Sequence, residues 1–486
     1  MVMELSPRFD YGRSVPWIYE EGDVLEAAVG PDALDVSATV GLDVEGGDIP
    51  ASFEVSEGDA AAFICRYRPS DSPMRTKPGP QEWRSLLDRT ERFWTEWASR
   101  CRYAGAWRHE VIRSLLTMKA LTYSSTGGLV AAVTTSLPEN LGGTRNWDYR
   151  YCWLRDSTLA LEVLIDNGYQ SEAEEFHDWI LRAMGGDADQ IQVMYAPTGE
   201  RRLPELKLDW LEGYEDSRPV RVGNAATEQF QLDVCGEVMD LFHTARRAGI
   251  DRDRAWPVQV DMAELVCKRW GDPDHGIWEM RVQPRQYVHS KAMAWVALDR
   301  AIKAVSDYGK PGAIDRWQGI REEIRSEVLD KGVDRKRGCL TMSYGTREVD
   351  SSLLRLPLVG FLAADDDVMA ATIEAIEQDL VIDGLVRRYR TKEVDDGIGE
   401  SEGAFFLCTF WLVCCYVLYG RKKEAQEMFN HAVSLANDVG LFAEQYDHSV
   451  GRQVGNFPQA FSHFSLVTAA LALERGVEAP GLIRGA

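Results

Sequence analysis

Twelve stretches of helical periodicity, joined by connections of two kinds, constrain the fold of this chain more than any other feature. Apolar residues recur at spacings of three and four in each stretch, as on the buried face of a helix. The stretches are residues 109–122, 156–168, 171–186, 226–248, 252–270, 289–306, 312–331, 351–362, 367–379, 402–419, 421–436 and 460–475. Because they read as six consecutive pairs, the sequence predicts a mainly α fold in which six helix pairs close into an (α/α)6 barrel.

Polar loops rich in aromatic residues precede every second stretch, whereas the opposite connections are mostly short. The long loops are residues 146–157, 210–224, 276–281, 337–350, 387–403 and 444–459. Closure of the helix pairs into a ring would bring all six loops to one rim, around the N-termini of the inner helices. We therefore expect the chemistry of the protein at that rim.

The first 80 residues differ from the rest and form a separate predicted region. Five segments alternate or cluster β-forming residues, with Gly, Asp and Pro between them. These segments are residues 17–21, 24–29, 33–40, 51–56 and 60–67. Five strands are few for a closed sandwich, so we expect a partial antiparallel β-sandwich. It packs against the helical part or pairs with another chain, which leaves a homo-oligomer open.

A linker connects the two predicted regions. Residues 69–80 are rich in Pro, Ser and Lys, and residues 81–100 have the pattern of one amphipathic helix. The sequence thus predicts three parts: a β-sandwich-like region over residues 1–80, a linker helix over residues 81–100 and a barrel domain over residues 101–486.

Composition excludes several classes of function. The 77 acidic residues outnumber the 54 lysines and arginines, and the net charge of −23 argues against binding to nucleic acid or to an anionic membrane. No run of eighteen apolar residues predicts a membrane span, and the first residues lack the apolar run of a signal peptide. The nine cysteines show no CxxC spacing, which indicates reduced thiols. Together these features predict a cytoplasmic protein.

The loop before the second helical stretch has the composition of a sugar-binding surface. Tyr149, Tyr151 and Trp153 alternate along an extended segment, so their rings are expected on one side. Aromatic rings stack on the apolar faces of sugars, and Arg155 with Asp156 offers donors and acceptors for hydroxyl groups. Capping of the next helix by Asp156 is the alternative, but it leaves the density of aromatic residues unexplained.

Two glutamates on this rim stand in contrasting surroundings. Glu279 follows Trp278 between apolar residues, which predicts lost hydration, a raised pKa and the role of a general acid. Glu444 is followed by Gln445 and Tyr446, which can hydrogen-bond an ionised carboxylate. Such a pair suits cleavage of a glycosidic bond. Chemistry and spacing alone do not prefer these two over Glu228, Glu237 or Glu402.

Motifs for other catalytic chemistry are missing from the sequence. It contains no HExxH spacing for a metal and no GxSxG elbow for a nucleophilic serine. It also contains no GxGxxG and no GxxxxGK[ST] for a nucleotide. We therefore expect neither a metal nor a cofactor.

The loops carry a resemblance to a known family. D-Y-x-Y-x-W-x-R-D-S stands at Asp148–Ser157, I-W-E at Ile277–Glu279, F-F-L-C-T at Phe405–Thr409 and E-Q-Y at Glu444–Tyr446. In this order the motifs resemble those of glycoside hydrolase family 15, the glucoamylase and trehalase-type enzymes, over about residues 101–476. The resemblance implies an (α/α)6 barrel and hydrolysis of an α-glucoside in a single displacement with inversion.

The resemblance also implies roles for individual residues. Glu279 matches the general acid, and Glu444 matches the general base that activates water. Arg155 and Asp156 match a pair that grips hydroxyls of the terminal glucose. Inverting enzymes hold the two carboxyl groups about 6.5–9.5 Å apart, which leaves room for the water. The residues expected to line or contact the substrate are Tyr149, Trp153, Trp278 and Arg388.

Two departures from the family pattern bear on the substrate and on the N-terminal region. Fungal glucoamylases have a second glutamate directly after the acid, where this chain has Met280. The leaving-group subsite is thus expected to differ, which favours a short α-glucoside such as trehalose over starch, with maltose-type, isomaltose-type and dextran substrates left open. The segment PRFDYGR…PW resembles the second half of the family's N-terminal β-sandwich, so its first half is expected to be missing.

Two other functions remain as alternatives to an enzyme. One is a non-catalytic carbohydrate-binding or regulatory protein on the same barrel, which the shortened N-terminal region favours. The other is a helical scaffold that binds protein partners. Retention of both glutamates speaks against the first alternative, and the concentration of Trp and Tyr at one rim speaks against the second.

Overall fold

The computed structural model describes residues 1–363 and 365–476, and the chain divides into two compact units at Ser99 and Arg100. The first unit holds the predicted strands and the helix α1 (Pro80–Ser99), which matches the predicted linker helix within one residue at each end. The second unit holds the remaining helices and the loops that carry the predicted chemistry.

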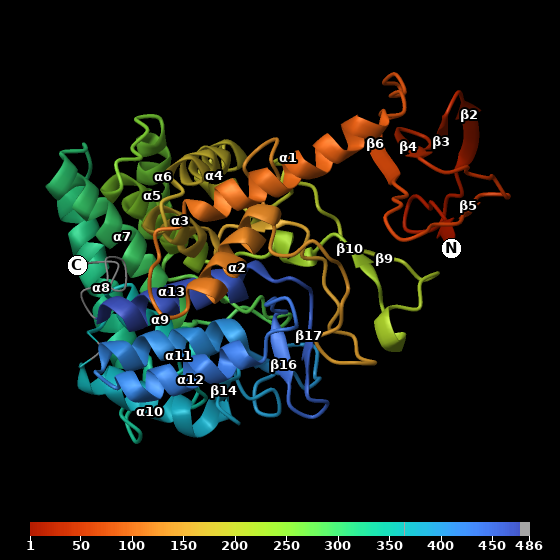
Figure 1. The fold of residues 1–486 in the computed structure, drawn as a ribbon. Helices are drawn as coiled ribbons and strands as arrows, with labels where there is room; N and C mark the ends of the chain where they lie inside the picture. The colour runs from red at the N-terminus through yellow and green to blue at the C-terminus, as the bar shows by residue number, and fades with distance from the viewer. Residues whose placement is uncertain (364, 477–486) are drawn as a thin grey trace. The chain divides into compact units, whose positions relative to one another are not determined.

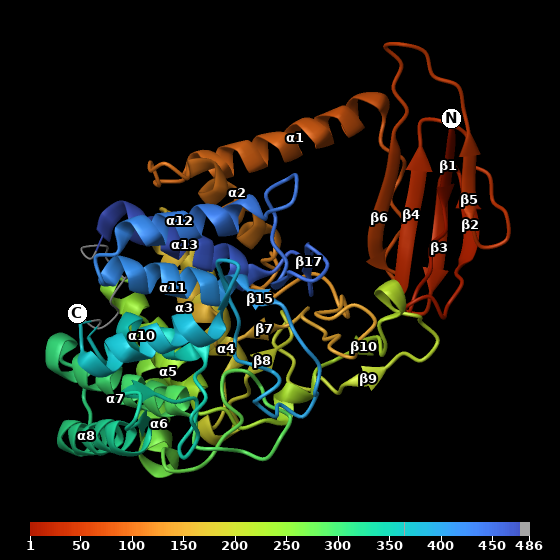
Figure 2. The same cartoon turned by 90° about the horizontal axis from the view of Figure 1, so that it is seen from below.

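The strands of the first unit form two antiparallel sheets, which Figure 2 shows. Four strands pair in the order β2-β3-β4-β6, and β1 pairs with β5. The strands are β1 (Val2–Leu5), β2 (Trp17–Glu21), β3 (Val24–Val29), β4 (Asp32–Ala38), β5 (Ile49–Ser52) and β6 (Phe63–Pro69). The strand β1 was missed in the sequence because its four residues are defined by pairing with β5, more than forty residues along the chain.

Both sheets contribute to one apolar cluster. Leu25 and Val36 of the larger sheet meet Ile49 of the smaller one, and all three are buried. On the opposite face of the larger sheet, Arg68 is buried in an ion pair with Asp35. The segment after β6 returns over this pair, since the Arg75 backbone N–H donates to Asp35 over 3.1 Å. Part of the predicted linker is thus tied to the sheet.

The helices of the second unit follow the predicted stretches closely. They are α2 (Arg108–Ala120), α3 (Ser157–Asp166), α4 (Gln170–Ala183), α5 (Asp233–Arg247), α6 (Ala255–Arg269), α7 (Val288–Tyr308), α8 (Ile314–Lys331), α9 (Arg355–Leu358), α10 (Asp367–Leu380), α11 (Phe406–Leu418), α12 (Lys422–Ser434) and α13 (Ala460–Arg475). Most ends lie within three residues of the prediction, but three helices begin four or more residues later than predicted, and one of them, α9, also ends four residues early.

Local contacts explain the three late starts. Residues 226–232 are not yet α-helical, because the Asn224 side chain caps a short 3-10 helix and the chain straightens before α5. In the stretch 351–362, Asp350 caps another 3-10 turn before α9. In the stretch 402–419, residues 404 and 405 form a strand before α11 begins. All three late starts follow rim loops. There, side-chain caps and strand pairing engage backbone groups before the α-helix begins.

Six of these helices form a closed inner ring, as the predicted (α/α)6 arrangement requires. Each helix in the series α3, α5, α7, α9, α11 and α13 contacts the next one, and α13 contacts α3. Of the other helices, α2, α4, α6, α8 and α12 each contact one or two members of this ring, and α10 contacts the 3-10 turn that precedes α9. Figures 1 and 2 show the helices from two directions.

Burial separates the inner helices from the outer ones. Every residue of α11 from Phe406 to Val417 is buried, because neighbours cover this helix on all sides. On the outer helix α8, by contrast, the buried residues are Trp317, Ile324 and Val328, which lie on one face. The difference follows from sequence, since α11 has no charged residue and α8 has charged residues between its apolar ones.

A five-stranded antiparallel sheet joins two of the rim loops. Its order is β13-β14-β15-β16-β17. The strands are β13 (Val381–Ile382), β14 (Leu385–Val386), β15 (Ala404–Phe405), β16 (Gln445–Asp447) and β17 (Arg452–Val454). The sheet fixes the residues directly after β14 and directly before β16, which include Arg388 and Glu444.

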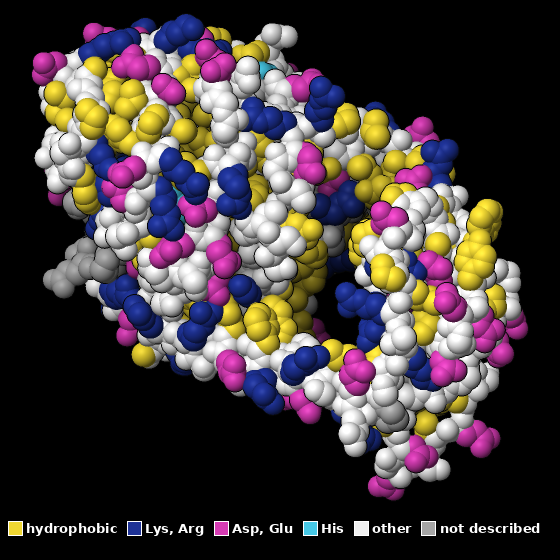
Figure 3. Space-filling view, turned by 90° about the horizontal axis from the view of Figure 1, so that it is seen from above, with side chains coloured by type: hydrophobic (Ala, Val, Ile, Leu, Met, Phe, Trp, Pro, Cys, Tyr) yellow, Lys and Arg dark blue, Asp and Glu magenta, His cyan; other side chains and the backbone are white. Residues whose placement is uncertain are grey.

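The surface carries side chains of both charges (Figure 3), and the cysteines that the structure describes form no disulfide bonds. Lys and Arg side chains are interspersed with Asp and Glu side chains on the face that Figure 3 shows. In the described part of the chain none of the nine cysteines forms a disulfide bond. None of the helices in the described parts of the chain is long and apolar enough to cross a membrane.

Helix contacts inside the ring generate a first prediction. Gly236 of α5 packs so closely on α7 that a Cβ atom would lie 2.2 Å from the Met293 carbonyl oxygen. Replacement Gly236→Ala is therefore expected to destabilise the helical unit by about 1–3 kcal/mol, lowering its urea midpoint. Gly319→Ala on α8 is the control, since open space surrounds it, and alanine there should stabilise by about 0.5–1 kcal/mol. An unchanged midpoint for Gly236→Ala would contradict the close packing.

Candidate active site

One cavity at the rim holds most of the residues that the sequence singled out. It has an empty volume of about 360 Å³. Both predicted catalytic glutamates line it, together with five of the six predicted substrate residues. These lining residues are Tyr149, Trp153, Arg155, Trp278, Glu279, Arg388 and Glu444. The sixth substrate residue, Asp156, lies behind the wall and contacts Arg155.

Glu279 enters the cavity from a strained turn. Its φ of 58° is in the left-handed region, which is uncommon for a residue other than glycine. The turn is held by the Glu279 N–H, which donates to the Gly276 carbonyl over 3.1 Å, and by Gln229, whose amide donates to the Glu279 carbonyl over 3.2 Å. Strain of this kind persists where surrounding contacts enforce it, and it is common at functional sites.

Hydrogen bonds and charge hold one oxygen of the Glu279 carboxylate. The Trp153 indole N–H donates to Oε1 over 2.6 Å, and the Arg155 guanidinium lies 3.3 Å from the same oxygen. The Glu279 side chain is 20% exposed. The apolar shield that the sequence predicted is thus replaced by two donors that contact Oε1.

Arg155 is itself fixed by its neighbours. Its Nε donates to Asp156 over 2.9 Å, and its Nη1 donates to the Ile277 carbonyl over 3.1 Å. Burial disfavours the charged guanidinium, but the carboxylates of Asp156 and Glu279 outweigh burial and raise the pKa of Arg155. Asp156 occupies the N-cap position of α3 without a side-chain capping bond. Its carboxylate therefore binds Arg155 and does not cap the helix.

Glu444 approaches the cavity from the start of β16. Its side chain is 2% exposed but still lines the cavity. The Tyr149 hydroxyl donates to Glu444 Oε1 over 3.0 Å. Burial, followed by the nearby carboxyl group of Glu139, raises the pKa of Glu444 well above its ordinary value. The two predicted catalytic carboxyl groups therefore differ strongly in exposure and in partners.

An aromatic pair connects the two carboxylates. The rings of Tyr149 and Trp153 meet edge to face with centroids 5.4 Å apart. Tyr149 binds Glu444 and Trp153 binds Glu279, so this pair sets the two carboxylates on either side of it. Tyr151, the third ring of the predicted alternation, is not among the described residues that line the cavity.

Trp278 forms another wall of the cavity. Its indole N–H donates to Asp350 over 3.1 Å, and its ring contacts Phe405 at a centroid distance of 6.2 Å. Burial raises the pKa of Asp350 to about 6. The Arg388 guanidinium lies 5.5 Å from the centre of the Trp278 ring. The predicted substrate arginine and this tryptophan therefore form a cation–π contact.

A buried ionic network behind the cavity was missed in the sequence. Arg388 forms a bidentate pair with Glu402, and Arg145 pairs with Asp396 and lies 3.4 Å from Glu402. Arg145 also donates to the Glu400 carbonyl over 3.1 Å. The only signal for Arg145 was its position just before the recognised motif, and for Glu402 its place in the loop that precedes α11.

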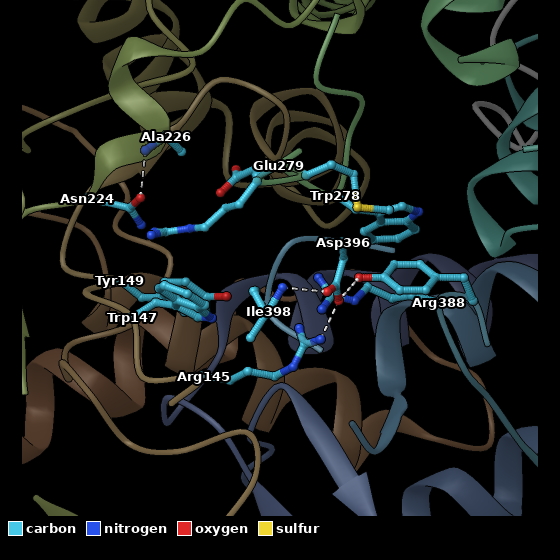
Figure 4. A pocket seen from close by; sticks show the side chains of 13 residues that line it. Arg145, Trp147, Tyr149, Asn224, Ala226, Trp278, Glu279, Arg388, Asp396 and Ile398 are labelled. Carbon is cyan, nitrogen blue, oxygen red and sulfur yellow. Dashed lines mark hydrogen bonds and ion pairs between the residues drawn. The ribbon is translucent and has the colours of Figure 1, made fainter. Parts of the chain in front are cut away.

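A second cavity of about 450 Å³ adjoins the first and shares Tyr149, Trp278, Glu279 and Arg388 with it. Arg145, Arg388 and Asp396 converge on one side of it, as Figure 4 shows. Its other lining residues include Trp147, Asn224, Ala226, Met280, Arg281 and Ile398. Met280 is also part of a buried apolar cluster, so the position after Glu279 is occupied by packed side-chain atoms.

The arrangement suits a neutral, polyhydroxylated ligand. Two carboxyl groups, two arginines and several aromatic rings line one cavity, and a second cavity continues from it. Aromatic walls with a few fixed donors and acceptors are typical of sugar sites. No group of three or more His, Cys, Asp or Glu residues within the described ranges has the arrangement of a metal site.

Comparisons with known proteins agree with this chemistry. The sequence profile of "Glycosyl hydrolases family 15" matches residues 105–471. A trehalase of Mycolicibacterium smegmatis is 41% identical, over 98% of this chain and 73% of that protein. A trehalase of Thermoplasma acidophilum is 40% identical, over 98% of this chain and 81% of that protein.

Solved structures show the same fold at low sequence identity. A bacterial glucoamylase complexed with acarbose superposes with a TM-score of 0.72 at 15% identity, covering 95% of this chain and 74% of that one. A glucoamylase from Saccharomycopsis fibuligera gives a TM-score of 0.58 at 13% identity, covering 75% of this chain and 93% of that one.

The buried network predicts a pH-dependent loss of stability in Arg145→Met. This substitution leaves Asp396 and Glu402 without a buried cation, which should cost about 3–5 kcal/mol at pH 7. Burial opposes ionisation of Asp396, but Arg145 outweighs it and lowers the pKa of Asp396 below 3.8. The stability from this group is thus present at neutral pH and is lost only as pH falls through the lowered pKa.

Without Arg145 the buried carboxyl groups should take up protons on folding. The difference in the free energy of unfolding between wild type and variant is therefore expected to narrow from pH 7 to pH 5. Urea denaturation at both pH values measures it. Arg335→Met is the control, because Arg335 and its partner Asp330 are both exposed. An equal difference at both pH values would show that packing, rather than charge, is what Arg145 supplies.

Proposed function

Because the chain belongs to glycosyl hydrolases family 15, and is therefore a glycoside hydrolase, we propose that it acts as an inverting exo-α-glucosidase with trehalose as its substrate. The observation that carries this proposal is the placement of Glu279 and Glu444 on one cavity, in contrasting surroundings. Membership in an enzyme family also weighs against the non-catalytic alternatives.

Two observations favour a disaccharide as the substrate. The relatives in Mycolicibacterium smegmatis and Thermoplasma acidophilum are trehalases. The two adjoining cavities share Glu279, so the bond between two sugar rings would lie at this carboxylate. Met280 stands where the leaving-group subsite of fungal glucoamylases would have a carboxylate, and Arg281 and Asn224 offer hydrogen-bond donors to the second ring.

In the proposed reaction Glu279 protonates the glycosidic oxygen as the bond to the anomeric carbon breaks. The contacts from Trp153 and Arg155 both go to Oε1, which leaves Oε2 to carry the proton. These contacts also stabilise the carboxylate that remains after proton transfer. Arg155, held by Asp156, has further donors that reach hydroxyls of the ring in the first cavity.

Glu444 acts from the other side of the aromatic pair. Its carboxylate accepts a proton from water while the water oxygen forms a bond to the anomeric carbon, which inverts the configuration there. Tyr149 orients the base through its hydrogen bond to Oε1. One proton leaves Glu279 and one arrives at Glu444, so solvent must exchange both before the next cycle.

Substitutions at the two glutamates test the assigned roles. Glu279→Gln and Glu444→Gln should each lower kcat/KM for trehalose about 10²–10⁴-fold with unchanged circular dichroism. With α-glucosyl fluoride, whose leaving group needs little protonation, Glu279→Gln should regain much of its activity and Glu444→Gln should not. Glu228→Gln, an exposed glutamate near the same rim, is the control and should keep wild-type turnover. Near-normal turnover of trehalose by either variant would remove that residue's role.

The anomers of the product test the stereochemistry. Inversion of trehalose releases one β-glucose from the attacked ring and one α-glucose as the leaving group, whereas retention would release α-glucose from both. Proton NMR of fresh product, before mutarotation, should show equal amounts of the two. A panel with maltose, isomaltose, starch and dextran should give a lower kcat/KM for each than trehalose. A preference for starch would contradict the disaccharide site.

A further inference from the structure

Glu139 lies beside the proposed base and has no assigned role. Its loop is tied to the β16–β17 hairpin, because the Gly455 N–H donates to the Pro138 carbonyl over 2.7 Å. Gly455 also packs on both side chains: a Cβ atom there would lie 3.2 Å from Glu444 Oε2 and 3.8 Å from Glu139 Cγ. The backbone at Gly455 therefore lies directly against both side chains.

These two carboxyl groups are buried and incompletely satisfied. Each side chain is 2% exposed, and the Oε2 atoms of both receive no hydrogen bond from a donor group. The groups lie within hydrogen-bonding reach of each other. The Tyr149 hydroxyl is 3.0 Å from Glu444 Oε1 and 3.4 Å from Glu139 Oε1. Because this hydroxyl has one hydrogen, it satisfies only one carboxylate at a time.

Nearby cations do not neutralise the pair. Arg388 Nη2 lies 3.8 Å from Glu139 Oε2, but it already forms an ion pair with Glu402. Arg145 also faces Glu139 and is shared with Glu402. Burial raises the pKa of both carboxyl groups, with the larger effect on Glu444. The charge of Glu402 adds to the rise at Glu139, and the charge of Glu139 adds to the rise at Glu444. Both arginines stabilise the charge on Glu139, so a single proton is expected on Glu444, hydrogen-bonded to Glu139.

Resting on the proposed role of Glu444 as base, we propose that Glu139 is a positioning residue that shares one proton with Glu444 and so sets the pH at which the base becomes available. Only the pair that has lost this proton can accept one from the attacking water. The negative charge of Glu139 then makes Glu444 a stronger base. After each cycle the proton received from water passes from Glu444 to solvent.

The pH dependence of kcat/KM tests this inference. Glu139→Gln keeps the shape of the side chain but removes its charge, so Glu444 should ionise more readily. The acidic limb of the profile is expected to move to lower pH by about one unit or more, as for two strongly coupled groups. Glu139→Asp restores a carboxylate and should return the limb toward the wild-type position. A limb that stays in place in Glu139→Gln would overturn the inference.

Two further measurements separate this inference from the proposed function. Glu427→Gln makes the same change in net charge at a side chain that is 66% exposed and should leave the limb unchanged. Infrared difference spectroscopy should show a protonated carboxyl group that titrates above the ordinary range of glutamate, and both Glu139→Gln and Glu444→Gln should abolish it. Wild-type protein with this band but without hydrolase activity would refute the function alone. An active enzyme without the band would refute the shared proton alone.

Discussion

The contact between α13 and α3 closes the inner ring, and the geometry of the site depends on this closure. It joins the last helix of the barrel to the first inner helix, so the loops before them become neighbours. Tyr149 and Glu444 meet across 295 positions of sequence for this reason. Helix pairs stacked in an open array would present the same motifs at the same spacing, but would leave the proposed base far from the aromatic pair.

Charge is the second constraint on the site. Arg145 and Arg388 are both buried, and between them they face Glu139, Asp396 and Glu402. Carboxyl groups outnumber guanidinium groups here, and Glu444 adds another. A buried carboxylate without a cation is costly. Protonation of one carboxyl group therefore reduces the excess of negative charge. The ionic network that holds the rim loops together thereby also influences the acidity of the proposed base.

The helices and the residues of the cavity were predictable because their signals are local. Apolar spacing defined twelve helical stretches, and the segment from Tyr149 to Asp156 carried aromatic rings and a charged pair within eight residues. The late starts of α5, α9 and α11 and the rim sheet were not predicted, since they depend on caps and strand pairs formed between distant segments. Glu139 and Arg145 were missed, and Glu402 could not be singled out, for the same reason: each is an ordinary charged residue until its partners come together in the fold.

The left-handed turn at Glu279 couples the proposed acid to the second cavity through the chain itself. Met280 and Arg281, which line that cavity, follow Glu279 directly, and the Arg281 N–H donates to the Asp396 carbonyl over 2.9 Å. A substitution at Met280 or Arg281 that alters the fit of the proposed second sugar would also change the direction of the Glu279 carboxylate. Asn224 and Ile398 line the same cavity from independent loops. On the proposed function, new leaving-group preferences would therefore evolve more readily at those two positions than in the two residues that follow Glu279.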